Sequence, residues 1–349
     1  MSIATVSALS MARYTRNNVR LMQSEMQTLQ LEMSNGLKVD IAGSNGSRTA
    51  SLLELRNVRN EVAQFKDNLV GQSTRLSLMQ DALDEVRKST EEVRNLALTA
   101  SGTSSDIANA TIAEAAQNAM KTVVNMLNSS QSGRFLFAGT KFDQQPLVQP
   151  DAVGPSGVTP TQAVSDVITS AGGLASLTTA ADVDALIDGP GGLATLFSAA
   201  NYGDNFFNGA TTPVVGRVEG DITIAYEATA GDQPVRDIMQ GLYMLAAVPS
   251  DSVTPAAYQQ LAKRSWELLE RGLGGVVNTQ GILGQSEQTV KAAQDRLAVQ
   301  DTLVSKQIVK MEEADIYTTS LRLDTLKTQL EATFKVTASL QGLSLINYL

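Results

Sequence analysis

The sequence predicts a mainly α-helical protein, in which long helices from both chain ends form antiparallel coiled coils and a small mixed domain containing β-structure is inserted between them. Apolar residues recur every seven positions over long stretches near both ends. The segment between these stretches is acidic and rich in Gly, Ala, Thr, Asp and Pro. A sustained seven-residue repeat is typical of a left-handed coiled coil, so the ends and the middle are expected to fold differently.

Two apolar stripes occupy the N-terminal part of the chain. The first stops at Ser34-Asn35-Gly36, where glycine can supply the left-handed cap of a helix. The loop VDIAGSNGSRTAS follows it, and its Asn-Gly and Gly-Ser pairs are typical of a turn. The second stripe then continues in steps of three and four, through Leu55, Val58, Val62, Phe65, Leu69, Leu76, Met79, Leu83, Val86, Val93 and Ala97.

The middle, residues 142–255, gives weaker signals. Only RFLFAGTKF at its entrance and RVEGDITIAYEAT within it are compatible with the alternation of strands. We therefore expect a small mixed domain with long loops.

The C-terminal part repeats the helical pattern from about Ala256. Leu283, Val290, Leu297, Val304 and Met311 are spaced by sevens, and after a shift of phase the stripe continues towards the chain end. No proline follows Gln285, so the sequence contains nothing that must interrupt one very long helix.

The residue types restrict the chemistry. The chain has no histidine and no cysteine, which excludes imidazole bases, thiol nucleophiles and disulfides. Three groups of carboxylates remain as candidates for acid–base or metal chemistry, but a charged outer face of a coiled coil explains them more simply; they are Asp84-Glu85, Glu91-Glu92 and Glu312-Glu313-Asp315. The run Gly189-Pro190-Gly191-Gly192 lacks the Lys-Ser/Thr of a phosphate-binding loop. We expect no enzyme, and no catalytic, cofactor or metal site.

The charge distribution bears on partners. The net charge is -9, and the stretch from Lys141 to Asp251 holds three basic residues against thirteen acidic ones. Nucleic-acid binding needs a basic face, so it is not expected. No apolar run is long enough for a membrane span, and the polar face of the tail carries too little positive charge for binding a membrane surface.

The chain ends are the candidate assembly interface. A terminal helix with one apolar face must find another helix to cover it, and the first stripe is available. The methionines of that stripe could form an adaptable partner surface or an ordinary coiled-coil core, and neighbouring subunits could make the two the same. The predicted interface residues are Val19, Met22, Met26, Leu29, Met33, Leu323, Leu326, Leu330, Phe334, Leu340, Leu343 and Ile346.

Several stretches resemble a known family. LQLEMSNGLKV (Leu29–Val39) is similar to the motif that ends the first helix of flagellins and their relatives in bacterial flagella. GRFLFAGTKFDQQPL (Gly133–Leu147) and the ending SLINYL resemble the hook-associated members of this flagellin-like family. The loop VDIAGSNGSRTAS departs from the Asp-Asp-Pro or Asp-Asp-Ala loop of many relatives.

The resemblance implies a structural component of the flagellum, an adaptor that joins hook to filament, with a minor flagellin as the alternative. It implies self-association in a helical layer, a neighbouring hook-associated protein on the hook side, flagellin on the filament side and an export chaperone. It also implies an extracellular location reached without a cleavable signal peptide. By this resemblance, residues 1–40 with 300–349 would form an inner tube, residues 41–141 with 256–299 a helical shell, and residues 142–255 a solvent-facing domain.

Overall fold

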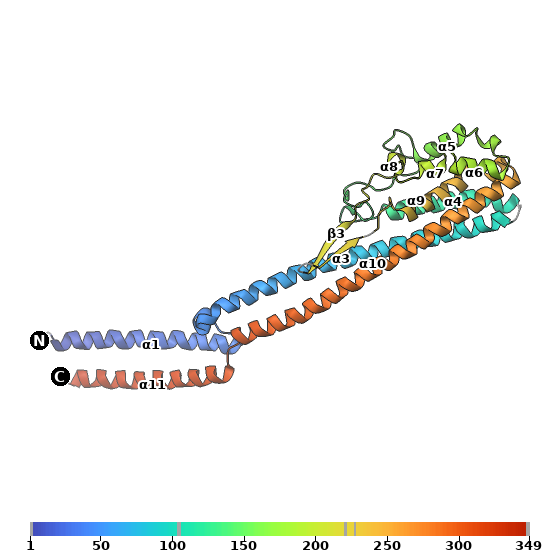
Figure 1. Ribbon diagram of the computed structural model, residues 1–349. Coiled ribbons are helices and arrows are strands. Elements are labelled where there is room, and N and C mark those ends of the chain that lie inside the picture. Colours follow the sequence, from blue (N-terminus) through green and yellow to red (C-terminus); the bar gives the residue numbers. More distant parts are fainter. Residues whose placement is uncertain (1–2, 103–105, 220–221, 227, 347–349) are drawn as a thin grey trace. The chain divides into compact units, whose positions relative to one another are not determined.

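The computed structural model describes residues 3–102, 106–219, 222–226 and 228–346; the side chains of residues 3–9, 106–110 and 340–346 lie outside this description. Most of the described chain is helical (Figure 1). The α-helices are α1 (Ile3–Asn35), α2 (Ile41–Asn45), α3 (Thr49–Gly102), α4 (Asp106–Leu127), α5 (Pro160–Ser170), α6 (Ala180–Asp188), α7 (Leu193–Leu196), α8 (Tyr202–Asn205), α9 (Gln233–Ala247), α10 (Pro255–Glu312) and α11 (Ile316–Ile346). Two antiparallel pairs of strands complete it, β1 (Ser130–Gln131) with β2 (Arg134–Phe135) and β3 (Val214–Glu219) with β4 (Ile222–Tyr226).

The chain divides into two compact units. Unit 1 comprises Met1–Gln64 and Leu297–Leu349, and unit 2 comprises Phe65–Arg296. The division falls inside α3 and inside α10, so each of these helices contributes one part to each unit. The prediction of a mainly helical chain with long helices from both ends is confirmed.

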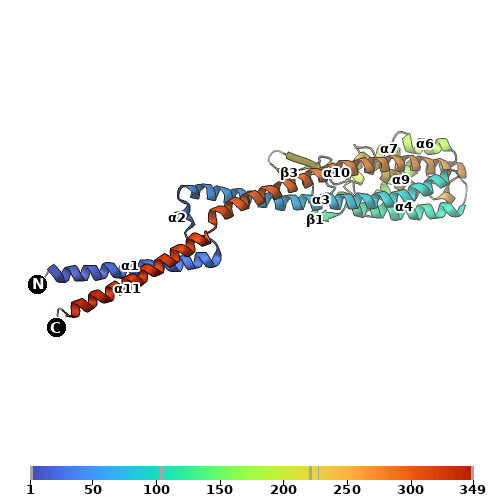
Figure 2. The same cartoon turned by 90° about the horizontal axis from the view of Figure 1, so that it is seen from below.

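In unit 1 the two terminal helices lie side by side. α1 and α11 run antiparallel, as both views show (Figures 1 and 2). The first turns of α3 pack against the last turns of α10 through a small core of Leu52, Val304 and Ile308. Unit 1 is therefore built from two helix pairs, each combining the two ends of the chain.

In unit 2 the predicted seven-residue repeats are buried. Leu69, Leu76 and Val86 of α3 are at most 2% exposed, as are Leu283 and Val290 of α10. The predicted repeat is thus confirmed as a core-forming pattern.

The inserted segment is more helical than the sequence predicts. Within RVEGDITIAYEAT, residues 217–219 and 222–226 lie in the antiparallel pair of β3 and β4, as predicted, but RFLFAGTKF contributes only the two-residue strand β2. α9 was not predicted, because the many Gly, Ala and Pro residues of this segment obscure the helical spacing of its apolar residues. Its buried face packs on an aromatic cluster in which the rings of Phe197 and Phe206 lie 4.5 Å apart and those of Phe206 and Tyr243 lie 5.5 Å apart.

The C-terminal part is not one continuous helix, although no proline interrupts it. α10 ends at Glu312 and α11 begins at Ile316. The Asp315 carboxylate accepts the backbone N–H groups of Tyr317 at 3.0 Å and Thr318 at 3.3 Å, which caps the start of α11. An N-cap can begin a new helix without any proline, so the absence of proline gives no information about this break.

Candidate assembly interface

The structure brings most of the predicted interface residues together in one seam between α1 and α11. On α1 all five predicted side chains are partly buried; they are Val19, Met22, Met26, Leu29 and Met33. On α11 Leu323 and Leu326 are 7% and 2% exposed, and Leu330 is partly buried. Beside the seam, the Arg322 guanidinium donates to the Glu25 carboxylate at 3.0 Å. Within a single chain, these residues therefore cover one another.

Phe334 does not lie on this seam. After Leu330 the half-buried positions are Thr333 and Thr337, in steps of three and four, while Phe334 is 50% exposed. The sequence prediction placed Phe334 in the seam because its side chain is large and apolar. The seam position is Thr333, one residue earlier. Leu340, Leu343 and Ile346 belong to α11, but their side chains lie outside the described part of the chain.

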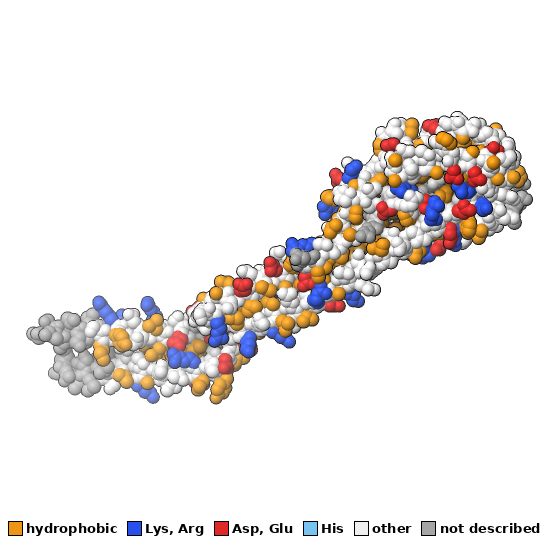
Figure 3. All heavy atoms as spheres, in the orientation of Figure 1, with side chains coloured by type: hydrophobic (Ala, Val, Ile, Leu, Met, Phe, Trp, Pro, Cys, Tyr) orange, Lys and Arg blue, Asp and Glu red, His pale blue; other side chains and the backbone are white. Residues whose placement is uncertain are grey.

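The flanks and outer sides of the same helix pair carry large apolar side chains that stay exposed among the described residues. We call these residues the outer apolar set: Tyr14, Leu21 and Leu31 of α1, and Leu321, Phe334 and Val336 of α11, all between 50% and 69% exposed. Figure 3 shows hydrophobic side chains at the surface of these helices. Sequence reasoning missed all of them except Phe334, because it sought one stripe per helix. The sequence does contain a signal for these residues. α11 has apolar residues on every side, which is typical of a helix surrounded by other helices.

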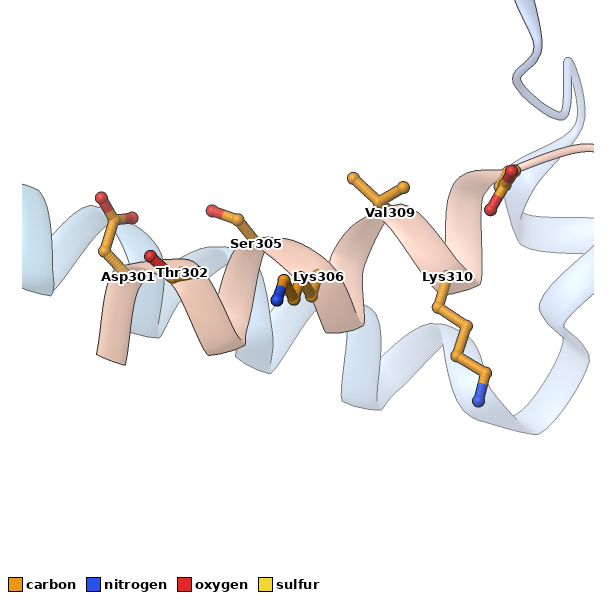
Figure 4. Close-up of a pocket in the computed structure, with 7 residues that line it drawn as sticks. Asp301, Thr302, Ser305, Lys306, Val309 and Lys310 are labelled. Atoms are coloured by element: carbon orange, nitrogen blue, oxygen red, sulfur yellow. The ribbon is translucent and has the colours of Figure 1, made fainter. Parts of the chain in front are cut away.

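The α10 part of unit 1 offers an open surface rather than an enclosed pocket. The hollow there is lined by Asp301, Thr302, Ser305, Lys306, Val309, Lys310 and Glu313. Figure 4 shows that its labelled side chains all project from this one helix. Sites for small molecules are concave and enclose most of the ligand, so this surface does not suggest one.

Four of the candidate carboxylates, Asp84, Glu91, Glu312 and Asp315, take part in ion pairs or a helix cap. On α3, Asp84 contacts Arg87 at 2.6 Å and Lys88 at 2.7 Å, and Arg87 also contacts Glu91 at 2.8 Å. Hydrogen bonds from Lys88 and then Arg87 lower the pKa of Asp84. Such pairs three and four residues apart are typical of a helix surface. Glu312 pairs with Arg56. In the described part of the chain, no three potential metal-ligating side chains gather into a site.

The glycine run forms a turn between α6 and α7. Gly189 caps α6, and a Cβ at this position would lie 2.2 Å from the Ala185 carbonyl oxygen. Gly191 has φ +73°, which favours glycine. The backbone therefore explains these glycines without a ligand. No helix among the described residues is long and apolar enough to cross a membrane.

Comparison with known families identifies the class of protein. Residues 6–142 match the N-terminal helical region of bacterial flagellin, and residues 267–349 match its C-terminal helical region. The two matches together span more than half of the sequence, and the chain belongs to the bacterial flagellin family. A search of curated proteins found no match.

Comparison with solved structures gives more specific relatives. A Vibrio parahaemolyticus protein assigned to the flagellar hook-associated proteins is 15% identical, with a TM-score of 0.53 over 77% of this chain and 99% of that one. Hook-associated protein 3 from Legionella pneumophila is 12% identical, with a TM-score of 0.51 over 74% of this chain and 98% of that one. FlgL from Bacillus cereus is 13% identical, with a TM-score of 0.50 over 73% of this chain and 99% of that one. At these identities the likeness establishes a shared fold.

Proposed function

We propose that this protein is a structural component of the bacterial flagellum that joins the hook to the filament, as the third hook-associated protein. The observation that carries the proposal is the α1–α11 pair. Its seam residues cover one another, yet large apolar side chains on both helices remain exposed. The flagellin-family matches at both ends and the fold shared with hook-associated proteins support it.

Exposed apolar residues are concentrated in unit 1, which contains the proposed assembly helices α1 and α11. Most of the large exposed hydrophobic side chains lie in unit 1, although unit 1 is the shorter of the two. Monomers rarely leave such a surface uncovered. Further copies of the same helix pair would cover it, and a contact between different faces of successive copies extends into a helical layer.

The finer assignments belong to the same proposal. Residues 1–40 with 300–349 would form the inner tube of the layer, residues 41–141 with 256–299 its shell, and the acidic residues 142–255 the domain that faces solvent outside the cell. The partners would be a hook-associated protein on the hook side, flagellin on the filament side and a chaperone before export. The role is architectural, and hydrophobic burial between subunits would supply its free energy.

A minor flagellin is the second candidate, because the family matches fit both roles. Deleting the gene in its host and examining cells by electron microscopy separates the two. The junction role predicts hooks without filaments and unpolymerised flagellin in the medium. Filaments of normal or merely altered form would reject the junction role and favour the minor flagellin.

A further inference from the structure

Residues 197–207 meet α9 in the aromatic cluster of unit 2. The ring of Tyr202 in α8 lies 5.2 Å from that of Phe206, which in turn lies 5.5 Å from that of Tyr243 in α9. Tyr202 and Tyr243 are only 1% and 2% exposed. Because α9 packs on α4, this cluster attaches the inserted segment to the long helices of unit 2.

Three buried polar atoms in and beside the cluster lack a partner. Neither the hydroxyls of Tyr202 and Tyr243 nor the Nε of Arg236 have a hydrogen-bond partner among the described residues. The terminal nitrogens of Arg236 are engaged, since Nη1 donates to the Gly231 carbonyl at 2.9 Å and Nη2 donates to the Gln233 amide oxygen. Polar groups removed from water without a partner cost free energy, and folded proteins satisfy nearly all of them.

The three atoms belong to neighbouring side chains. Arg236 and Tyr243 lie seven residues apart on α9 and therefore on the same side of that helix. Burial raises the pKa of Tyr202, and the Arg236 guanidinium opposes that rise. Burial also raises the pKa of Tyr243, and Tyr202 adds to that rise. Such effects act between groups that are close together, so the atoms form one polar cluster.

The chemistry of the cluster fits water. The Arg236 Nε–H is a donor, and each tyrosine hydroxyl can both donate and accept. An internal water molecule typically makes about three hydrogen bonds to buried polar groups that have no other partner. We propose that the hydroxyls of Tyr202 and Tyr243 and the Nε–H of Arg236 bind internal water, which bridges α8 and α9. The inference concerns unit 2 alone and does not depend on the role in the flagellum.

Phenylalanine substitutions test the proposal by the sign of their effect. A hydroxyl that binds internal water stabilises the fold, so its loss lowers the unfolding midpoint; a hydroxyl that binds nothing is a burden, so its loss raises the midpoint. We expect Tyr202→Phe and Tyr243→Phe each to lower the midpoint by about 2–4 °C. Because both hydroxyls share the water, the double variant should lose less than the sum. Fluorescence of Trp266, the only tryptophan of the chain, follows the unfolding of unit 2 in the full-length protein.

The matched control is Tyr258→Phe in α10. The Tyr258 hydroxyl also lacks a partner among the described residues, but burial alone raises the pKa of this tyrosine, so it has no comparable polar neighbour. The control should leave the midpoint unchanged or raise it. A crystal structure of the full chain should show water within hydrogen-bond distance of Tyr202 Oη and Tyr243 Oη. Unchanged or raised midpoints in both single variants, strictly additive losses, or no water density at these atoms would each overturn the proposal.

Discussion

Asp237 of α9 and Arg271 of α10 form an ion pair in which the two partners differ in exposure. The carboxylate side chain is 3% exposed and the guanidinium side chain 64% exposed. The arginine donates from Nε to Oδ2 at 2.6 Å, and its NH2 donates to Oδ1 at 3.0 Å. Losing the arginine would leave a buried charge that, among the described residues, keeps only the Gln233 amide as a side-chain donor.

We therefore expect Arg271→Met to lower the free energy of unfolding by about 3 kcal/mol. Urea denaturation followed by circular dichroism measures it. The matched control is Arg94→Met, whose partner Glu270 is 53% exposed, and which should cost no more than about 1 kcal/mol. Equal losses in the two variants would show that burial of Asp237 does not govern the effect.

Three buried tyrosines are expected to make the stability of the protein sensitive to alkali. The hydroxyls of Tyr202, Tyr243 and Tyr258 have no hydrogen-bond partner among the described residues. Burial raises the pKa of Tyr258 to about 12 and raises the pKa values of Tyr202 and Tyr243 further. Because the folded chain holds these protons more tightly, the stability they contribute is complete below about pH 10 and is lost as the pH rises above it.

The free energy of unfolding should accordingly stay level between about pH 6 and pH 9, where no histidine or cysteine titrates, and should fall above about pH 10. Tyr258→Phe should reduce that fall and change little at neutral pH, whereas Tyr14→Phe, at a 69% exposed site, should leave it unchanged. A steep change near neutral pH would contradict this explanation.

At the scale of elements, α9 and α10 approach closely because glycine lies between them. A Cβ on Gly272 would lie 2.6 Å from the Ile238 side chain and 2.8 Å from the Pro234 carbonyl oxygen. Gly274, two residues further along α10, has nothing within 4 Å of such a Cβ.

Gly272→Ala should therefore destabilise unit 2 by about 1–3 kcal/mol through overpacking. Gly274→Ala should stabilise the helix by up to about 1 kcal/mol, because alanine favours helix. Thermal unfolding of the two variants checks both signs. If both variants change the stability in the same direction, the contact of Gly272 with α9 does not limit how closely α9 and α10 approach.

The long helices were predictable because the repeat that buries Leu69, Leu76 and Leu283 is visible in the sequence. The break between α10 and α11 was not, because its backbone partners are Gly36 and Lys38, at the other end of the chain. α9 was missed for a different reason. Its apolar positions have a helical period, but loop-forming residues surround it on both sides.

At the scale of the whole molecule, the sequence predicted which residues of the terminal helices pack together but not which apolar side chains the helix pair leaves exposed. Heptad spacing located the seam residues, such as Met26 and Leu326, and the structure shows that these cover each other within one chain. The apolar residues that stay exposed, Leu21 and Leu321 among them, are recognisable only once the helix pair has a defined orientation. Phe334 belongs to this exposed group and not to the seam.

We expect the outer apolar set of unit 1 to hold copies of the chain together. The most direct measurement is complementation of the deletion strain with Leu321→Ser/Phe334→Ser/Val336→Ser, followed by electron microscopy of filaments and detection of the secreted protein. We predict that the variant is exported but leaves hooks bare. The control Val153→Ser/Val215→Ser/Ile222→Ser, at exposed sites of the inserted domain, should restore filaments. Normal filaments with the α11 variant would contradict the account.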